Sequence, residues 1–182
     1  MRKEKVILGI DPGTNVMGFG VLLVNNRELT SAGLGIVKMT EGDYGLKLKT
    51  IFEQTLKLID THLPDELAIE APFYGKNVQS MLKLGRAQGV AMAAALYREV
   101  PITEYSPRKI KQSITGNGGA SKEQVAAMIK QLVKLDRLPK YLDATDGLAV
   151  AICHHFQSNK PNGGKSTGSW EQYIKQNPNK IR

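Results

Sequence analysis

The spacing of apolar residues changes once along this chain, and that change limits the folds that it can adopt. In the first forty residues, three apolar segments at 6–10, 17–24 and 29–39 are separated by short turns, which predicts three strands in an antiparallel meander. Farther along, apolar residues recur at helical spacing, interrupted by short strand-like segments at 66–70 and 102–105. The expected helices cover residues 46–62, 78–100, 107–114, 125–135 and 142–156.

This order of elements predicts an α/β protein. A meander followed by βα units builds a mixed five-stranded sheet with helices on both faces. The length of 182 residues suits one ordinary domain, which we place at residues 1–157. Residues 158–182 begin with a stretch rich in Gly, Ser, Asn and Lys, so we expect a basic, flexible C-terminal tail there.

Composition excludes several classes of protein. The single cysteine, Cys153, rules out an internal disulfide framework and a multi-cysteine zinc site. No apolar run approaches the roughly 20 residues of a membrane span, and the first apolar stretch breaks at Asp11, too early for a secretory signal. We therefore expect a cytoplasmic protein that has no membrane partner.

Positive charge is concentrated in the middle of the chain. The net charge is +8, and residues 76–140 hold 12 basic but only 4 acidic side chains. Any one lysine can simply solvate a helix face, but the asymmetry of the whole segment favours a polyanionic partner such as nucleic acid.

Four carboxylates stand where charge is costly to bury. Asp11 and Glu70 each end an apolar strand-like segment, whereas Asp143 and Asp146 share one face of an otherwise apolar helix. Each has an ordinary explanation when taken alone: Asp11 as a turn former, Asp143 as an acid that complements a helix dipole. Their common placement at the ends of buried elements instead predicts one convergent acidic site.

A hard divalent cation would compensate these charges. Oxygen ligands suit Mg²⁺ or Mn²⁺, while one cysteine and three histidines in the whole chain argue against zinc. Two such ions about 4 Å apart can activate a water and stabilise the leaving oxygen in phosphodiester hydrolysis. A basic chain with this acidic set is therefore consistent with a metal-dependent nuclease.

The chain resembles the RuvC-type Holliday junction resolvases, which belong to the RNase H-like superfamily of polynucleotide hydrolases. The resemblance covers roughly residues 5–156 and rests on an ordered set of motifs rather than on one. The motifs are Leu8-Gly-Ile-Asp-Pro-Gly-Thr14 with Gly18-Phe-Gly20, Ala68-Ile-Glu70 with Phe73, Leu82-Lys-Leu-Gly-Arg-Ala-Gln-Gly89, Tyr105 to Gly116, and Asp143-Ala-Thr-Asp-Gly-Leu-Ala149.

The resemblance implies an RNase H-like fold and a specific reaction. Asp11, Glu70, Asp143 and Asp146 match the family's Mg²⁺ site, which holds two ions, and Mn²⁺ is expected to substitute. The implied substrate is a four-way DNA junction, cut by paired symmetric nicks that leave 5′-phosphate and 3′-hydroxyl ends. The resemblance also implies a homodimer through the small-residue helix at 78–100, and a branch-migration complex as a further partner.

The resemblance also suggests roles for residues around the carboxylates. Lys111 and Lys122 match basic residues near the scissile phosphate, where a fixed ammonium offsets developing charge. Phe73 matches an aromatic that stacks on an unpaired base, and Tyr74 is the alternative stacking residue. Four further basic side chains are expected to contact phosphates: Lys76, Lys83, Arg86 and Arg108.

Two other functions compete with the nuclease hypothesis. The chain could be a DNA-binding module whose carboxylates are only structural. The turn at Asp11-Pro-Gly-Thr14 also occurs in actin-like phosphotransferases, although this chain is about half as long as such two-lobed folds need and lacks a second phosphate-binding turn. Metal-dependent nicking would separate the first alternative, and ATP turnover the second.

Overall fold

The computed structural model describes residues 4–26, 28–73, 77–133, 135, 137, 139 and 142–159. Two predicted DNA contacts, Tyr74 and Lys76, lie outside these residues, and so does nearly all of the predicted tail. None of the helices in the described part has the length and apolar character needed to span a bilayer.

The sheet has the predicted five strands, in the order β3-β2-β1-β4-β5. The first three pair antiparallel, and β4 and β5 extend the sheet in parallel with β1. The mixed α/β sheet predicted from the sequence is therefore confirmed. The strands are β1 (Lys5–Asp11), β2 (Val16–Asn25), β3 (Glu28–Lys38), β4 (Glu66–Glu70) and β5 (Ile102–Tyr105).

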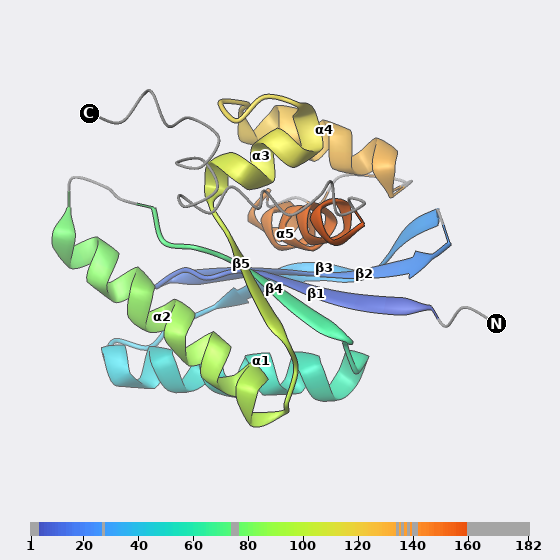
Figure 1. The fold of residues 1–182 in the computed structure, drawn as a ribbon. Helices are drawn as coiled ribbons and strands as arrows, with labels where there is room; N and C mark the ends of the chain where they lie inside the picture. The colour runs from blue at the N-terminus through green and yellow to red at the C-terminus, as the bar shows by residue number, and fades with distance from the viewer. Residues whose placement is uncertain are drawn as a thin grey trace, which may run out of the picture.

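Helices cover both faces of the sheet, as Figure 1 shows. One hydrophobic core lies between the sheet and α1 and α2, and a second lies between the sheet and α3, α4 and α5. The helices are α1 (Tyr44–His62), α2 (Val78–Tyr97), α3 (Pro107–Thr115), α4 (Lys122–Leu132) and α5 (Asp143–Ser158).

Local chemistry sets the helix boundaries more sharply than apolar spacing does. The sequence from Ser121 to Gln124 predicts a helix cap, and the Ser121 hydroxyl and the Gln124 side chain do form a capping box, so α4 begins at Lys122. At the other end, α2 stops at Tyr97 rather than at the predicted residue 100. There Glu99 adopts a φ of 57°, and the Val100 amide donates to the Ala95 carbonyl.

Helix α5 rests directly on the main chain of β1 and β2. A Cβ atom on Gly9 would lie 2.0 Å from the Gly147 carbonyl oxygen, and one on Gly18 would lie 2.3 Å from that of Asp143. A Cβ atom on Gly20 would meet the α5 backbone at 2.4 Å. Only glycine permits this approach, and the approach holds the first turn of α5 over the end of β1.

Candidate active site

Neighbouring strand ends place two of the four carboxylates side by side. Strands β1 and β4 are parallel, and Ile10 pairs with Ile69 in their register. The next residue in each strand is the predicted acid, Asp11 or Glu70, so both acids lie at the same edge of the sheet. Tight packing of α5 on β1 brings Asp143 and Asp146 to this edge.

The electrostatics of the two strand acids reflect this crowding. Burial, together with the negative charges of Asp146 and Asp143, raises the pKa of Asp11 to about 7. Burial and the charges of Asp11 and Asp146 raise the pKa of Glu70 to about 8. Burial is the larger cause of both shifts, and the neighbouring carboxylates add to it.

Lys122 is the cation in contact with this acidic cluster. Its ammonium donates to Asp146 Oδ2 at 2.7 Å and to Asp143 Oδ1 at 3.0 Å. Although partial burial lowers the pKa of Lys122, these two hydrogen bonds raise it above its ordinary value. The predicted catalytic lysine is thus paired with both acids of α5, although 21 and 24 residues separate it from them in the sequence.

The donor set fits a hard divalent cation, but its present spacing does not form a closed metal centre. All four side chains offer carboxylate oxygens, which are the ligands that Mg²⁺ and Mn²⁺ prefer. The raised pKa values of Asp11 and Glu70 mark a place where a cation would be stabilised. Within the described residues, no three His, Cys, Asp or Glu side chains stand close enough to hold a metal ion.

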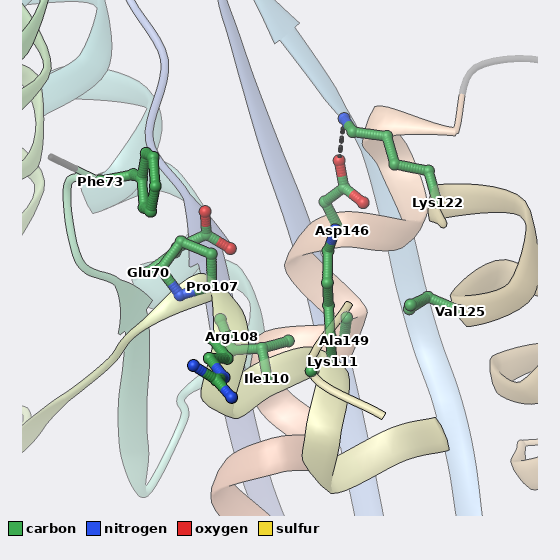
Figure 2. A pocket seen from close by; sticks show the side chains of 11 residues that line it. Glu70, Phe73, Pro107, Arg108, Ile110, Lys111, Lys122, Val125, Asp146 and Ala149 are labelled. Atoms are coloured by element: carbon green, nitrogen blue, oxygen red, sulfur yellow. Dashed lines mark hydrogen bonds and ion pairs between the residues drawn. The ribbon is translucent and has the colours of Figure 1, made fainter. Parts of the chain in front are cut away.

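A cavity of about 500 Å³ is lined by two of the four acids, Glu70 and Asp146. Figure 2 shows Glu70 on one side of it and Asp146, joined to Lys122, on the other. Lys111 on α3 lines the cavity, and its charge acts on Glu70. The Arg108 guanidinium points away from both carboxylates, so its predicted phosphate contact would lie at the rim of the cavity.

Phe73 stands at the mouth of this cavity and does not fold back on the core. Its side chain is 69% exposed. It also lines a second, apolar hollow of about 540 Å³, which Met81, Leu82 and Arg86 on α2 complete. An exposed aromatic ring between two hollows is placed to stack on a flat partner such as a base.

Gln88, to which we assigned no role from the sequence, links α2 to the site by hydrogen bonds. Gln88 is 6% exposed, and its amide donates to Glu104 Oε2 at 2.7 Å and to the Glu70 backbone carbonyl at 3.4 Å. A polar side chain in a helix rich in alanine and glycine was the available signal. Lys83, also on α2, lies instead in a separate polar hollow beside Tyr44.

Comparison with known proteins identifies the family. The family profile described as crossover junction endodeoxyribonuclease RuvC matches residues 7–154. The chain belongs to the RuvC family. It is 59% identical to the RuvC protein of Christiangramia forsetii over all of this chain and 95% of that protein, and 55% identical to that of Bacteroides fragilis over 99% and 97%.

Solved RuvC structures agree with this fold. The structure of Thermus thermophilus RuvC in complex with a Holliday junction has a TM-score of 0.79 and is 29% identical, over 85% of this chain and 94% of that one. The yeast mitochondrial Holliday junction resolvase shares the fold with a TM-score of 0.60 over 85% and 79%, at 15% identity. Family membership makes this chain a crossover junction endodeoxyribonuclease, and therefore a hydrolase.

Proposed function

We propose that this RuvC-family chain resolves four-way DNA junctions by two symmetric nicks that leave 5′-phosphate and 3′-hydroxyl ends. One observation carries the proposal: Glu70 from β4 and Asp146 from α5 line one cavity together with Lys111 and Lys122, and the charge of Asp11 from β1 acts on Glu70. Carboxylates that bind cations, beside ammonium groups that bind phosphates, can promote metal-dependent phosphodiester hydrolysis.

The metal assignment follows from the donor chemistry. Asp11, Glu70, Asp143 and Asp146 would hold two Mg²⁺ ions, and Mn²⁺ would substitute. When bound, such ions supply an activated water and charge stabilisation at the leaving oxygen. The unusually high pKa values of Asp11 and Glu70 support this assignment, because a cation would bring both carboxyls to their charged form.

The chain's own cations and aromatic ring would orient the substrate. Lys111 reaches into the cavity and would anchor the scissile phosphate, and Lys122 would join it once released from the α5 acids. Phe73 would stack on a base unpaired at the junction centre. Arg86 and Arg108 would contact neighbouring phosphates. From the sequence alone, we assign a phosphate contact to Lys76 and keep Tyr74 as the alternative stacking residue.

We also propose that the active form is a homodimer built through α2. This helix exposes half or more of the side chains of Val78, Leu82, Leu96 and Tyr97. Gly85 and Gly89 face open space, which leaves room for the close approach of a second helix. A two-fold dimer would match a junction with two equivalent scissile strands.

The remaining assignments concern the setting of the enzyme. We place the nuclease domain at residues 1–157 and assign residues 158–182 to a basic tail, with its 5 basic and 1 acidic side chains from residue 157 onward. We assign the enzyme to the cytoplasm. A branch-migration complex would be a further partner, because the crossover must be brought to a site that the enzyme can cut.

Cleavage of a labelled mobile four-way junction tests the proposal. The reaction is run with Mg²⁺, with Mn²⁺ and with EDTA, beside a linear duplex of the same sequence. Paired nicks that need the metal and spare the duplex are expected. Tight junction binding without cuts in either metal would instead favour a binding module with structural carboxylates.

A further inference from the structure

A small polar hollow lies apart from the active-site cavity. Its volume is about 210 Å³, and its lining comes from the β1–β2 turn, the β3–α1 connection, the start of α1 and the second turn of α2. Both of its charged lining residues are lysines. The lining residues are Thr14, Asn15, Gly42, Tyr44, Lys47 and Lys83.

Hydrogen bonds hold the walls of this hollow in place. The Lys47 ammonium donates to Asn15 Oδ1 at 2.6 Å, and the Asn15 carbonyl accepts from the Met39 amide at 2.9 Å. The Tyr44 hydroxyl donates to the Lys83 carbonyl at 2.7 Å, which ties the first turn of α1 to α2. The Lys83 ammonium lies 6.0 Å from the centre of the Tyr44 ring. The hollow is therefore built by contacts between segments that are far apart in the sequence.

The charge of the two lysines is not taken up by acids that line the hollow. Among the described residues, neither ammonium has a carboxylate within 4.0 Å. The neighbouring acids have other partners: Asp43 caps the Leu46 amide, and Glu41 accepts from the Thr50 hydroxyl, although Lys47 also contributes to lowering the Glu41 pKa. Two ammonium groups beside hydroxyl and amide donors form a site suited to an anion with several oxygens.

A fourth hollow lies beside the acids. It measures about 150 Å³ and is lined by Asp11, Pro12, Glu70, Phe73 and Leu84, among others. Pro12 is two residues before Thr14, and Leu84 follows Lys83 directly. The Cα atoms of Asp11 and Thr14 are at most about 11 Å apart along the chain. A polynucleotide strand that leaves the carboxylates along the β1–β2 turn would pass over Pro12 toward Thr14, which lines the hollow together with the two lysines.

We propose that this hollow binds a backbone phosphate of the cleaved DNA strand, roughly two to four nucleotides from the scissile phosphate, given the spacing of phosphates along a strand. The inference rests on the proposed function, because it takes DNA at the carboxylates as given. Lys47 and Lys83 supply the charge, and Thr14 supplies a neutral donor. The site fixes the register of the strand without reading its sequence, since phosphate contacts carry no base information.

A scan with neutral phosphates tests this site. A four-way junction carries one methylphosphonate at successive positions on the scissile strand, and binding is measured in EDTA so that no strand is cut. Against wild type, one position should weaken binding about tenfold, which is the scale of a charge-assisted hydrogen bond. In the double variant Lys47→Gln/Lys83→Gln, the same methylphosphonate should cause no further loss.

Two matched variants make the result specific. Lys57→Gln removes one positive charge from an exposed position on α1, the helix that carries Lys47. This variant should keep the position-dependent loss of binding. Lys47→Arg/Lys83→Arg keeps both positive charges and should therefore also show the position-dependent loss of binding. This variant changes the same two side chains, so it controls for misfolding of the glutamine double variant. In the glutamine double variant, the slope of binding against salt should be shallower by about one unit for each phosphate that the protein no longer neutralises.

The outcomes separate the two proposals. A wild type that binds and cuts junctions, but whose methylphosphonate loss persists in the glutamine double variant, overturns the phosphate site and leaves the nuclease function standing. The phosphate site is likewise overturned if no methylphosphonate position weakens wild-type binding. A wild type that neither binds nor cuts junctions overturns both.

Discussion

The Lys122 ammonium lies 2.7 Å from Asp146 Oδ2 and joins α4 to the first turn of α5, which carries both Asp143 and Asp146. Asp146 is the less exposed of the two acids that Lys122 contacts, with 16% of its side chain accessible against 49% for Asp143. The same lysine is expected to contact the scissile phosphate. It therefore has two alternative partners, and a cation that neutralises the acids would free it for DNA.

Removal of Lys122 should strengthen metal binding in the absence of DNA. In Lys122→Met the two acids lose their ammonium partner, so Mn²⁺ should bind about fivefold more tightly, the scale of an exposed ion pair. Calorimetric titration of the free protein measures this, with Lys130→Met, an exposed lysine on the same helix, as the control. Cleavage should fall in Lys122→Met despite the tighter metal. Unchanged Mn²⁺ affinity would show that the ion pair does not compete with the metal.

The metal-free protein should become less stable as the pH rises. Because the folded pKa values of Asp11 and Glu70 are raised to about 7 and about 8, their contribution favours folding below the ordinary carboxyl pKa and is lost as the pH rises through those values. Thermal unfolding in EDTA from pH 5 to pH 9 should show this fall, and saturating Mg²⁺ should reduce it.

Asp11→Asn isolates the part of this effect that comes from one acid. The variant should be more stable than wild type at pH 9 in EDTA, by on the order of 1–3 kcal/mol, and should have a flatter pH profile. It should bind junctions but not cut them. A variant with normal cleavage would remove Asp11 from the metal site.

Phe73→Ala should separate cleavage from folding. The exposed ring contributes little to the core, so thermal stability should change by less than about 0.5 kcal/mol. Loss of base stacking should lower the single-turnover cleavage rate at saturating enzyme more than it weakens junction binding. Phe73→Trp, which retains a flat ring, should keep most of the rate. Equal rates for wild type and Phe73→Ala would exclude the stacking role.

Gly147→Ala tests the packing of α5 on the sheet. Its new Cβ would lie 2.4 Å from Phe19 Cα, so unfolding free energy should drop by about 3 kcal/mol. Gly33→Ala on β3, away from the proposed dimer helix, is the control, because its new Cβ would meet only His62 Cε1 at an ordinary contact distance of 3.8 Å, and it should be neutral or stabilising by up to about 1 kcal/mol. Denaturant unfolding of both variants and of wild type, at one protein concentration, measures the change in unfolding free energy. Equal stabilities would mean that α5 can lift from the sheet at little cost.

Apolar periodicity was sufficient to predict every strand and helix, because each buries one face or both. It did not locate boundaries that depend on single residues, such as the end of α2 before Glu99, whereas the capping-box sequence from Ser121 to Gln124 does mark the start of α4. The acids at Asp11 and Glu70 were visible because charge is unusual at the end of an apolar run.

Contacts between distant segments had no comparable signal in the sequence. Neither the pairing of Lys122 with Asp146 nor the bond from Gln88 to the Glu70 carbonyl follows from local pattern, because each joins separate elements. The hollow beside Tyr44 likewise exists only once α1, α2 and the β1–β2 turn are assembled. Such contacts become visible only when the positions of the folded elements are known.

The glycines beneath α5 also separate the thermal stability of this protein from the geometry of its acids. Since main chain meets main chain at Gly9, Gly18 and Gly147, the offset between Asp11 and the acids of α5 is set by backbone contact at these positions. Substitutions in the parts of the two cores that lie away from α5 can change the melting temperature while leaving the distances between the acids unaltered. Thermal adaptation and catalytic geometry can thus vary independently, as long as these glycines are kept.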